Sequence, residues 1–594
     1  MIRAPLRPLA RILPARTRGE NPDAIERENR RLRAEAAQNR ARARAEGRLI
    51  VLAGVFVLGF SAIGLQMGVQ AASEPAEPRR WAAEADIFAD RADIVDRHGR
   101  VLATNLATHS LYAQPHIMVE PERAARELAA IFPDLDAEAL ARRFSDPGRR
   151  FIWIKRRLSP EQIQAVHDIG EPGLLFGPRQ MRLYPNGRLA AHVLGGATFG
   201  REGVTAAEVV GVAGIERAFD DHLRDPANAG TPLTLSLDLT VQAVTTEVLE
   251  AGVRMLNARG GTAILMDAHS GEVVALVSLP DFDPNNRPSP LVEGDAADSP
   301  LFNRAVQGLY ELGSVFKTFA VAQGLETGSV QPQTMIDTRG PLRWGRFQIR
   351  DFRYHGPQQS VEQVLVKSSN IGTARIMQRI GGEQQRAFLA ELGLLAPTAI
   401  ELTEAPTARP KTPANWSDLS TMTISYGHGM SSSPLHLAAA YATLVNGGTR
   451  VTPTLIRNPR PVPGPHVISA ETSAILRDML RKVVTEGTAS MAEVAGYAVG
   501  GKTGSADKPR ARGGYYEDKV IATFAGAFPM HDPRYVLVVA LDEPVFAVGG
   551  EARRTAGWTA VPVAAEIVRR TAPLLGLRPE IAVAPGAGLT PVRN

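Results

Sequence analysis

One uninterrupted apolar run dominates the hydrophobic pattern of the chain. Residues 49–69, LIVLAGVFVLGFSAIGLQMGV, carry no charge and one Gln. A helix of this length spans roughly 31 Å at 1.5 Å per residue, which is enough to cross the hydrocarbon core of a bilayer. A buried core helix would normally keep a polar face, and a cleaved signal would have a shorter apolar core near the start of the chain. The pattern therefore predicts one transmembrane helix at 49–69.

Short strands and amphipathic helices alternate after this run. Residues 92–105 place apolar side chains on both sides of the turn sequence Arg-His-Gly-Arg at 97–100, which predicts a β-hairpin. Helical periodicity follows at 121–131 and 160–168. We recognise no convergent set of catalytic residue types here. The interval 70–230 is therefore interpreted as a mixed α/β pedestal domain, which begins with the short stiff linker SEPAEP.

The pattern changes near residue 231, where a second domain begins. A strand in TPLTLSLDL is followed by an amphipathic helix in TVQAVTTEVLEAGVRML and by two more strands, GTAILMDA and GEVVALVSL. This order of elements, strand, helix, strand and strand, indicates a compact α+β domain. We expect it to extend over 231–575. The remaining residues, 576–594, are rich in Pro, Gly and Ala and predict a flexible tail.

Charge and cysteine usage indicate on which side of the membrane each part lies. The basic leader, residues 1–48, holds thirteen Arg and no Lys against six acids, so it alone contributes +7 to a net charge of +5. The rest of the chain is nearly neutral, which argues against nucleic-acid binding. Cationic residues before the apolar run predict that the N-terminus is cytoplasmic and that everything after residue 70 lies outside. The absence of Cys fits an oxidising exterior and excludes a Cys nucleophile and a thiolate metal site.

Two short motifs in the second domain suit nucleophilic catalysis. Ser314 and Lys317 form a Ser-x-x-Lys pair at the expected start of a helix, which puts both side chains on one face, one turn apart. A neutral Lys amine can accept the Ser proton, and the helix N-terminus stabilises developing negative charge. Ser368 and Asn370 form a Ser-x-Asn motif, in which a hydroxyl can relay a proton and an amide can hold a carbonyl. Each motif alone is short enough to occur by chance, and the second is also typical of a helix cap.

The stretch GYAVGGKTGS at 496–505 admits two interpretations. Its letters match the phosphate-binding loop G-x-x-x-x-G-K-[ST], whereas Lys-Thr-Gly is also the third motif of serine enzymes that act on penicillin. A phosphate loop needs its Lys and Thr to open a helix, but the residues after Thr503 start a helix poorly. Alternation at 494–499 instead predicts a strand that presents Lys502 and Thr503 at its edge. We therefore expect no nucleotide to bind here.

Order and spacing join the three motifs into one constellation. Ser-x-Asn follows Ser-x-x-Lys after about fifty residues, and Lys-Thr-Gly follows about 130 later, which resembles the penicillin-recognising serine transferases. Further stretches are similar to class B penicillin-binding proteins, among them RADIVDRHGRVLATN, RLYPNGRLAAHVLG, FNRAVQGLYELGSVFK and SYGHGMSSSPLHLAAAYATLVNGG. The resemblance covers roughly residues 91–570. Leu312 stands where this family usually has Pro, which we expect to loosen the turn before Ser314, and Ala92 replaces a usual Gly.

The resemblance implies a fold and a reaction. The fold is α+β, with a transpeptidase domain built on a central antiparallel sheet flanked by helices, a preceding pedestal of the dimerisation type, and one transmembrane helix. The reaction is peptidoglycan D,D-transpeptidation on the D-Ala-D-Ala end of a stem peptide, through an acyl-serine intermediate and with an amine of a neighbouring stem peptide as acceptor. β-Lactams would inhibit it. No metal and no cofactor are implied, and we see no sign of a glycosyltransferase domain.

The resemblance also implies a role for each motif residue. Ser314 would be the nucleophile and Lys317 its general base, with a pKa depressed by burial and by the second ammonium, Lys502. Ser368 would pass the proton to the leaving group, and Asn370 would position the substrate amide. The backbone N–H groups of Ser314 and Ser505 would form the oxyanion hole. Lys502, Thr503 and Ser505 would hold the terminal carboxylate of the substrate, and Gly504 would belong to the same substrate-binding strand.

Location, partners and subtype follow from the same resemblance. The chain would be a single-pass protein of the bacterial inner membrane, with its catalytic domain in the periplasm, and it would work beside a polytopic glycan polymerase of the SEDS family and other division proteins. Tyr426-Gly427-His428-Gly429 resembles the septal type. The alternatives are an elongation-type relative, a β-lactam-sensing receptor, a β-lactamase, and a mainly scaffolding protein. The acceptor amine is left open.

Overall fold

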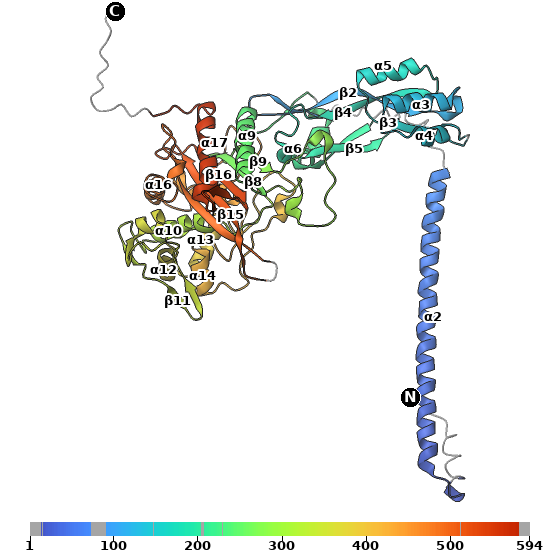
Figure 1. Ribbon diagram of the computed structural model, residues 1–594, viewed down its shortest axis with the longest axis horizontal. Helices are drawn as coiled ribbons and strands as arrows, with labels where there is room; N and C mark the ends of the chain where they lie inside the picture. Colours follow the sequence, from blue (N-terminus) through green and yellow to red (C-terminus); the bar gives the residue numbers. More distant parts are fainter. Residues whose placement is uncertain are drawn as a thin grey trace, which may run out of the picture.

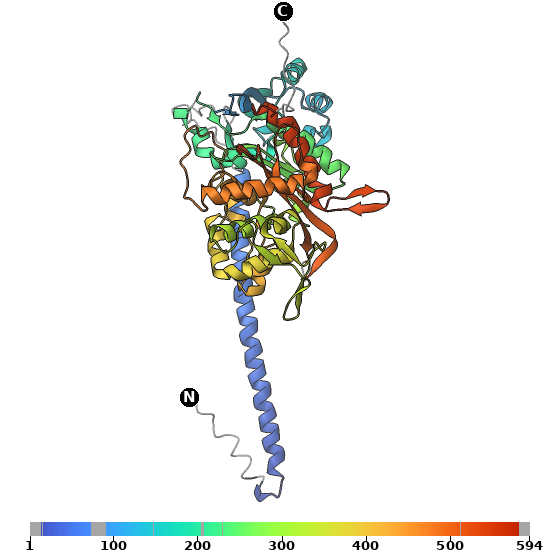
Figure 2. The same cartoon turned by 90° about the vertical axis from the view of Figure 1, so that its left-hand side faces the viewer.

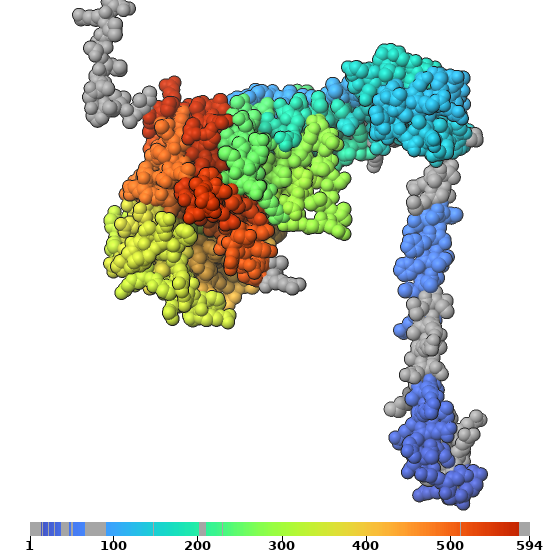
Figure 3. Space-filling view, viewed as in Figure 1, coloured from blue at the N-terminus to red at the C-terminus, as the bar shows by residue number. Residues whose placement is uncertain are grey.

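The computed structural model describes residues 14, 16–72, 91–146, 148–202, 207–228, 230–510 and 513–580. Beyond the N-terminal helix, residues 91–230 and the larger C-terminal part form two adjoining lobes (Figure 3). The linker SEPAEP and the last fourteen residues of the predicted tail, 581–594, lie outside the described residues.

The N-terminal helix α2 is continuous from Pro22 to Ala72 (Figure 1). It includes most of the basic leader and all of the predicted span at 49–69, with no break between them. The side chains of residues 49–50 and 66–69 lie outside the described residues. In the part of the chain that is described, no helix combines the length and the apolar character needed to cross a membrane.

The pedestal is built on a five-stranded sheet. Strand β2 is its longest member and pairs with β1, β3 and β4, all antiparallel. The predicted hairpin at 92–105 is confirmed, because β1 and β2 flank the turn at 97–100. The helices predicted at 121–131 and 160–168 are also found, and the former packs with α4 and α5 (Figure 1). The elements are β1 (Ile94–Val95), β2 (Val101–Ala113), α3 (Pro121–Ile131), α4 (Ala137–Phe144), β3 (Ile152–Lys155), α5 (Pro160–Ile169) and β4 (Leu174–Leu183).

Strand β7 joins the two lobes. It was expected to run through TPLTLSLDL and to open the second domain, but only Leu233–Thr234 forms a strand, and it pairs in parallel with β1 of the pedestal. Leu235 then forms a bridge to Ile456 in the C-terminal lobe. The elements before β7 are α6 (Ala191–Leu194), β5 (Gly196–Glu202), β6 (Ala207–Ala213), α7 (Gly214–Ala218) and α8 (Asp220–Arg224).

The C-terminal lobe contains the predicted central antiparallel sheet, in the order β14-β15-β16-β8-β9. The strands predicted in GTAILMDA and GEVVALVSL are confirmed as β8 and β9. Every residue of β9 and β16 is buried, because helices α9 and α17 (Figure 1) and helix α15 pack against the sheet. The strands are β8 (Gly260–Asp267), β9 (Val273–Leu279), β14 (Gly500–Pro509), β15 (Tyr515–Phe528) and β16 (Tyr535–Asp542), and the helices are α9 (Leu239–Met255), α15 (Pro434–Val445) and α17 (Ala560–Leu574).

A helical region covers the edge strand β14. Helix α16 packs against β14, and α10 lies against α12 and α16. The helices of this region are α10 (Lys317–Glu326), α11 (Val361–Val366), α12 (Asn370–Ile380), α13 (Gly382–Glu391), α14 (Asp418–Ile424) and α16 (Ala470–Thr485). Three small antiparallel pairs complete the lobe: β10 (Met335–Asp337) with β13 (Gln358–Ser360), β11 (Leu342–Trp344) with β12 (Phe347–Ile349), and β17 (Phe546–Val548) with β18 (Glu551–Arg553).

A buried ionic cluster stabilises the pedestal. The Glu216 carboxylate is fully buried and accepts hydrogen bonds from Arg91 Nε and Arg182 Nε, both at 2.7 Å. The Tyr184 hydroxyl donates to it at 3.3 Å, and Arg91 also binds Asp220 at 2.7 Å. These contacts bring together segments that are up to 129 residues apart in the sequence.

We predict that Glu216→Ala destabilises the pedestal by about 3–5 kcal/mol, because it leaves two buried guanidinium groups without their carboxylate. Urea unfolding followed by circular dichroism should show the pedestal transition at lower urea. Glu138→Ala is the control, since its ion pair with Arg142 is exposed and should change little. Equal transitions for both variants would contradict the prediction.

Candidate active site

Ser314 lies on a tight turn at the N-terminus of the central helix. The turn η5 (Gly313–Phe316) is 3₁₀, and α10 continues it directly from Lys317. Gly313 has φ +63°, and a Cβ there would lie 2.7 Å from the Ser505 carbonyl oxygen, so glycine is required. Leu312 is fully buried, and the Lys317 N–H closes the turn on the Ser314 and Val315 carbonyls. The turn is therefore closed by hydrogen bonds with Leu312 packed in the core, and a loosening relative to Pro stays a prediction.

Two buried lysines converge on the hydroxyl of Ser368. Lys317 Nζ lies 3.0 Å from Ser368 Oγ and 2.6 Å from its carbonyl oxygen. Lys502 Nζ, which comes from β14, lies 3.0 Å from the same Oγ. Lys317 is 1% exposed and Lys502 is not exposed at all. Within the described residues, Ser314 Oγ makes no hydrogen bond with Lys317 Nζ, so the structure shows the amine bound to Ser368.

Burial controls the protonation of both amines. Removal from water lowers the pKa of Lys502 to about 7. The pKa of Lys317 is lowered well below its ordinary value, first by burial and then by the charge of Lys502, while Asp351 acts in the opposite direction. An amine held in its neutral form can accept the proton of a serine hydroxyl, which is the requirement for a general base.

Asp351 fixes the second motif in place. Its carboxylate accepts hydrogen bonds from Ser369 Oγ at 2.7 Å and from the Ile371 N–H at 2.9 Å, at the N-terminus of α12. Ser369 caps that helix, and Asn370 Nδ2 donates to the Arg350 carbonyl at 2.8 Å. Ser368 has φ +62°, a conformation that is costly for a side chain larger than glycine and that needs such support. Asp351 was not predicted from the sequence, because an isolated Asp after a short strand gives no signal.

The third motif lies on the edge strand β14. Lys502 and Thr503 are buried, and the Thr503 hydroxyl is 2.7 Å from that of Thr488. The Ser505 hydroxyl accepts a hydrogen bond from the Ala556 N–H at 2.9 Å, so its own proton remains available for an acceptor. Thr488 and Ala556 were not predicted, because their proximity depends on how α16 and η8 (Ala556–Trp558) pack. No helix begins after Thr503, because β14 continues to Pro509, and this supports rejection of the phosphate-loop interpretation.

Backbone contacts between glycines bring β14 against the nucleophile turn. A Cβ at Gly504 would collide with the Leu312 carbonyl, and one at Gly427 would collide with the Gly313 carbonyl. The Gly313 N–H also donates to the Gly427 carbonyl at 3.2 Å. The backbones of Ser314 and Ser505 are therefore close neighbours, as a two-donor oxyanion hole requires.

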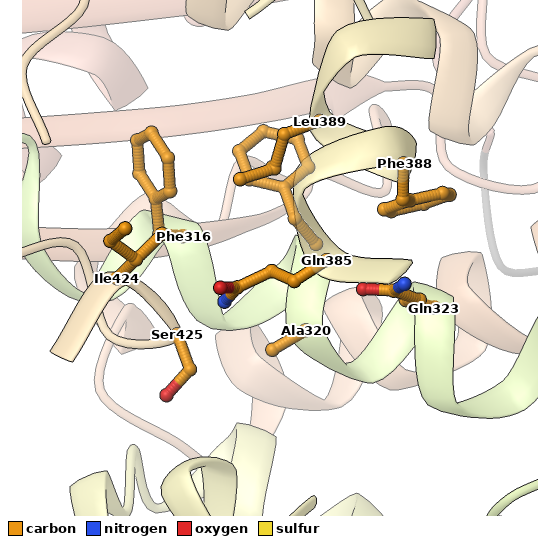
Figure 4. Close-up of a pocket in the computed structure, with 9 residues that line it drawn as sticks. Phe316, Ala320, Gln323, Gln385, Phe388, Leu389, Ile424 and Ser425 are labelled. Atoms are coloured by element: carbon orange, nitrogen blue, oxygen red, sulfur yellow. The ribbon is translucent and has the colours of Figure 1, made fainter. Parts of the chain in front are cut away.

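A small cavity of about 10 Å³ lies behind the nucleophile helix (Figure 4). Phe316, Ala320 and Gln323 line it from η5 and α10, and Phe388 and Leu389 line it from α13. None of the predicted site residues contributes to this cavity. It is part of the packing behind the site rather than a substrate pocket.

These features define a class of enzyme. A serine one turn before a buried lysine, a second serine between two lysines, and an edge strand against the nucleophile turn form a serine acyltransferase site of the penicillin-recognising type.

Comparison with known proteins identifies the family. Residues 261–569 match the penicillin-binding protein transpeptidase domain, and residues 86–229 match the penicillin-binding protein dimerisation domain. The chain belongs to the penicillin-binding protein family, as its motifs indicated.

The relatives of this chain include named transpeptidases. It is 34% identical over 557 residues to the probable peptidoglycan D,D-transpeptidase FtsI of Caulobacter vibrioides, with 91% of each chain covered. It is 28% identical to the peptidoglycan D,D-transpeptidase FtsI of Escherichia coli, covering 77% of this chain and 80% of that one. Penicillin binding protein 3 from Mycobacterium tuberculosis, solved with aztreonam, has a similar structure, with a TM-score of 0.62 and 25% identity over 83% of this chain and 98% of that chain.

We predict that Lys502→Gln moves the acidic limb of the pH–acylation profile to higher pH. A neighbouring positive charge lowers the pKa of Lys317, so its removal raises that pKa, and Lys317 then becomes neutral only at higher pH. The second-order rate of acylation by fluorescent penicillin between pH 5 and 9 measures the shift. Lys519→Gln, which replaces a partly buried lysine of β15 that pairs with Glu543, is the control. A limb that stays in place or moves to lower pH would refute this coupling.

Proposed function

We propose that this chain is a septal-type peptidoglycan D,D-transpeptidase that cross-links stem peptides and is inhibited by β-lactams. The observation that carries the proposal is the Ser368 hydroxyl, held 3.0 Å from each of two buried lysine amines, one of which lies one helical turn after Ser314. The names of the relatives and the match to the transpeptidase domain support the same activity.

The reaction begins with acylation of Ser314. Neutral Lys317 takes the hydroxyl proton while Ser314 Oγ attacks the carbonyl carbon of the penultimate D-Ala. The backbone N–H groups of Ser314 and Ser505 stabilise the oxyanion. Because its hydroxyl contacts both amines, Ser368 transfers a proton from Lys317 to the leaving nitrogen. The peptide bond breaks, terminal D-Ala departs with that proton, and an ester links the peptide to Ser314.

Transfer to the acceptor reverses these proton movements. An amine of a second stem peptide attacks the ester carbonyl and gives up a proton through Ser368 and Lys317 to Ser314 Oγ as the ester breaks. The third motif holds the carboxylate of the departing D-Ala: Thr503 and Ser505 offer hydroxyl donors, and Lys502 supplies positive charge. Asn370 holds the substrate amide from the opposite side of the site.

The septal subtype is supported by two observations. Relatives from Caulobacter vibrioides and Escherichia coli carry the name FtsI, and Tyr426-Gly427-His428-Gly429 resembles the septal sequence at the same place in the family. An elongation-type role is the alternative within the family. Replacement of the chromosomal gene in the source bacterium would separate the two, since loss of a septal enzyme gives filaments and loss of an elongation enzyme gives round cells.

The proposal includes an anchor in the inner membrane. Its support is the uncharged stretch at 49–69, which lies within α2, and the arginine-rich leader before it, which sets the orientation. The N-terminus is then cytoplasmic and the catalytic lobe periplasmic. In this location the enzyme works beside a SEDS-family glycan polymerase that supplies new strands, and with other division proteins.

We predict that fluorescent penicillin labels the wild type stably and that Ser314→Ala abolishes labelling, since Ser314 is the hydroxyl on the turn that packs against the Ser505 backbone, where the proposed oxyanion hole lies. Gel fluorescence and the intact mass of the full chain in detergent micelles report the covalent adduct. Ser329→Ala, beyond the end of α10, is the control and should label normally. Unlabelled wild type would indicate a scaffold, and a label lost within seconds would indicate a β-lactamase.

A further inference from the structure

A segment beside the catalytic site carries an unpaired positive charge. Residues 343–354, here called the basic segment, comprise the end of β11, β12 and the loop that follows, and they hold four Arg against one Asp. All four guanidinium side chains are exposed, and none forms an ion pair with any described residue. The four are Arg343, Arg346, Arg350 and Arg353. Arg339 nearby is not included, because it is paired with Asp337 at 2.9 Å.

The same segment exposes four aromatic rings. Phe352 is 86% and Tyr354 69% exposed, and in the β11–β12 hairpin Trp344 is 40% and Phe347 47% exposed. Arg346 lies over the Phe347 ring at 5.2 Å. The hairpin projects from the lower end of the lobe (Figure 2). Exposed aromatic side chains together with Arg are typical of recognition surfaces rather than of a surface that only faces water.

The basic segment is joined directly to the catalytic machinery. Its only acid, Asp351, faces inward and holds Ser369 and Ile371. The Arg350 carbonyl accepts the hydrogen bond of Asn370. Because these inward contacts fix the backbone at 350–351, the side chains of Arg350, Phe352 and Arg353 are displayed at the edge of the site. Asp351 forms no ion pair with the four arginines among the described residues, and its two carboxylate oxygens accept hydrogen bonds at the N-terminus of α12.

We propose that the basic segment binds the acidic part of the stem peptide, the residues that precede D-Ala-D-Ala and carry free carboxylates. The inference rests on the proposed function and adds a second recognition element to the same site. Arginine forks pair with carboxylates in a bidentate manner, and the aromatic rings bury the peptide stem beside them. The third motif then binds the terminal carboxylate of the peptide, and the basic segment binds the carboxylates of the residues that precede D-Ala-D-Ala.

A membrane surface is the other partner that basic and aromatic residues suit. The hydrogen bond from Asn370 to Arg350 favours the peptide, because a substrate already bound at Asn370 must pass the adjoining residues 350–353. A lipid surface would need no such connection to the catalytic helix.

The test measures how well peptides protect Ser314 from fluorescent penicillin, with the full chain in detergent micelles. One probe is a pentapeptide that ends in D-Ala-D-Ala and has free internal carboxylates, and the other is the same peptide with those carboxylates amidated. In the wild type we expect the acidic peptide to protect at about fivefold lower concentration, a preference that declines with added salt. In Arg350→Gln/Arg353→Gln the two peptides should protect at equal concentrations.

Matched variants and lipid additions make the outcome decisive. Arg254→Gln/Arg386→Gln removes two exposed arginines from α9 and α13 and should retain the fivefold preference. Melting midpoints equal to that of the wild type establish that each variant is folded. No preference in the wild type, or one that persists in Arg350→Gln/Arg353→Gln, overturns the inference. A difference between the variants that appears only with anionic lipid, and not between peptides, also overturns it and assigns the segment to a membrane. Wild type that no penicillin labels would instead refute the proposed function itself.

Discussion

The placement of two lysine amines around one serine hydroxyl, out of contact with water, is the constraint on which the site depends. Two ammonium groups in such surroundings repel each other and lack hydration, so the fold favours loss of a proton. Between about pH 7 and the ordinary lysine pKa, the unfolded chain binds more protons than the folded one. Stability therefore increases with pH across this window, and the burial that creates a base destabilises the fold at lower pH. The rest of the domain must offset that cost.

The offset comes from packing and from polar contacts that have no direct part in the chemistry. Lys317 and Ser368 are 51 residues apart, and Lys502 is a further 134 from Ser368, so only the folded domain brings them together. The buried sheet holds β14, and Asp351 holds α12. Three glycines allow backbone to approach backbone where any Cβ would collide. Such preorganised dipoles act on a transition state without rearranging during the reaction.

Much of the fold and of the candidate site could be predicted from the sequence. The contacts between residues far apart in the sequence could not, because they depend on how the whole chain packs. The strands in GTAILMDA and GEVVALVSL could be predicted because both faces of each strand are apolar. The motif residues could be predicted because each motif is a short local pattern; they are Ser314, Lys317, Ser368 and Lys502. Asp351 was missed because its role depends on a contact with α12 about 20 residues later. The strand expected in TPLTLSLDL was predicted too long, and its pairing with β1 of the pedestal could not be predicted because it depends on residues far apart in the sequence. The effect expected of Leu312 on the turn before Ser314 stays a prediction.

The Arg350–Asp351 pair shows how one stretch of backbone can serve catalysis and recognition together. Its carbonyl and carboxylate point inward and fix the helix that carries Asn370, while the neighbouring guanidinium groups point outward without acidic partners. A peptide bound outside would therefore contact the same rigid residues that position the second motif inside. Since those residues are held by the hydrogen bonds of α12, binding energy gained at the proposed peptide-binding surface would help to align the scissile bond without reorganising a loop.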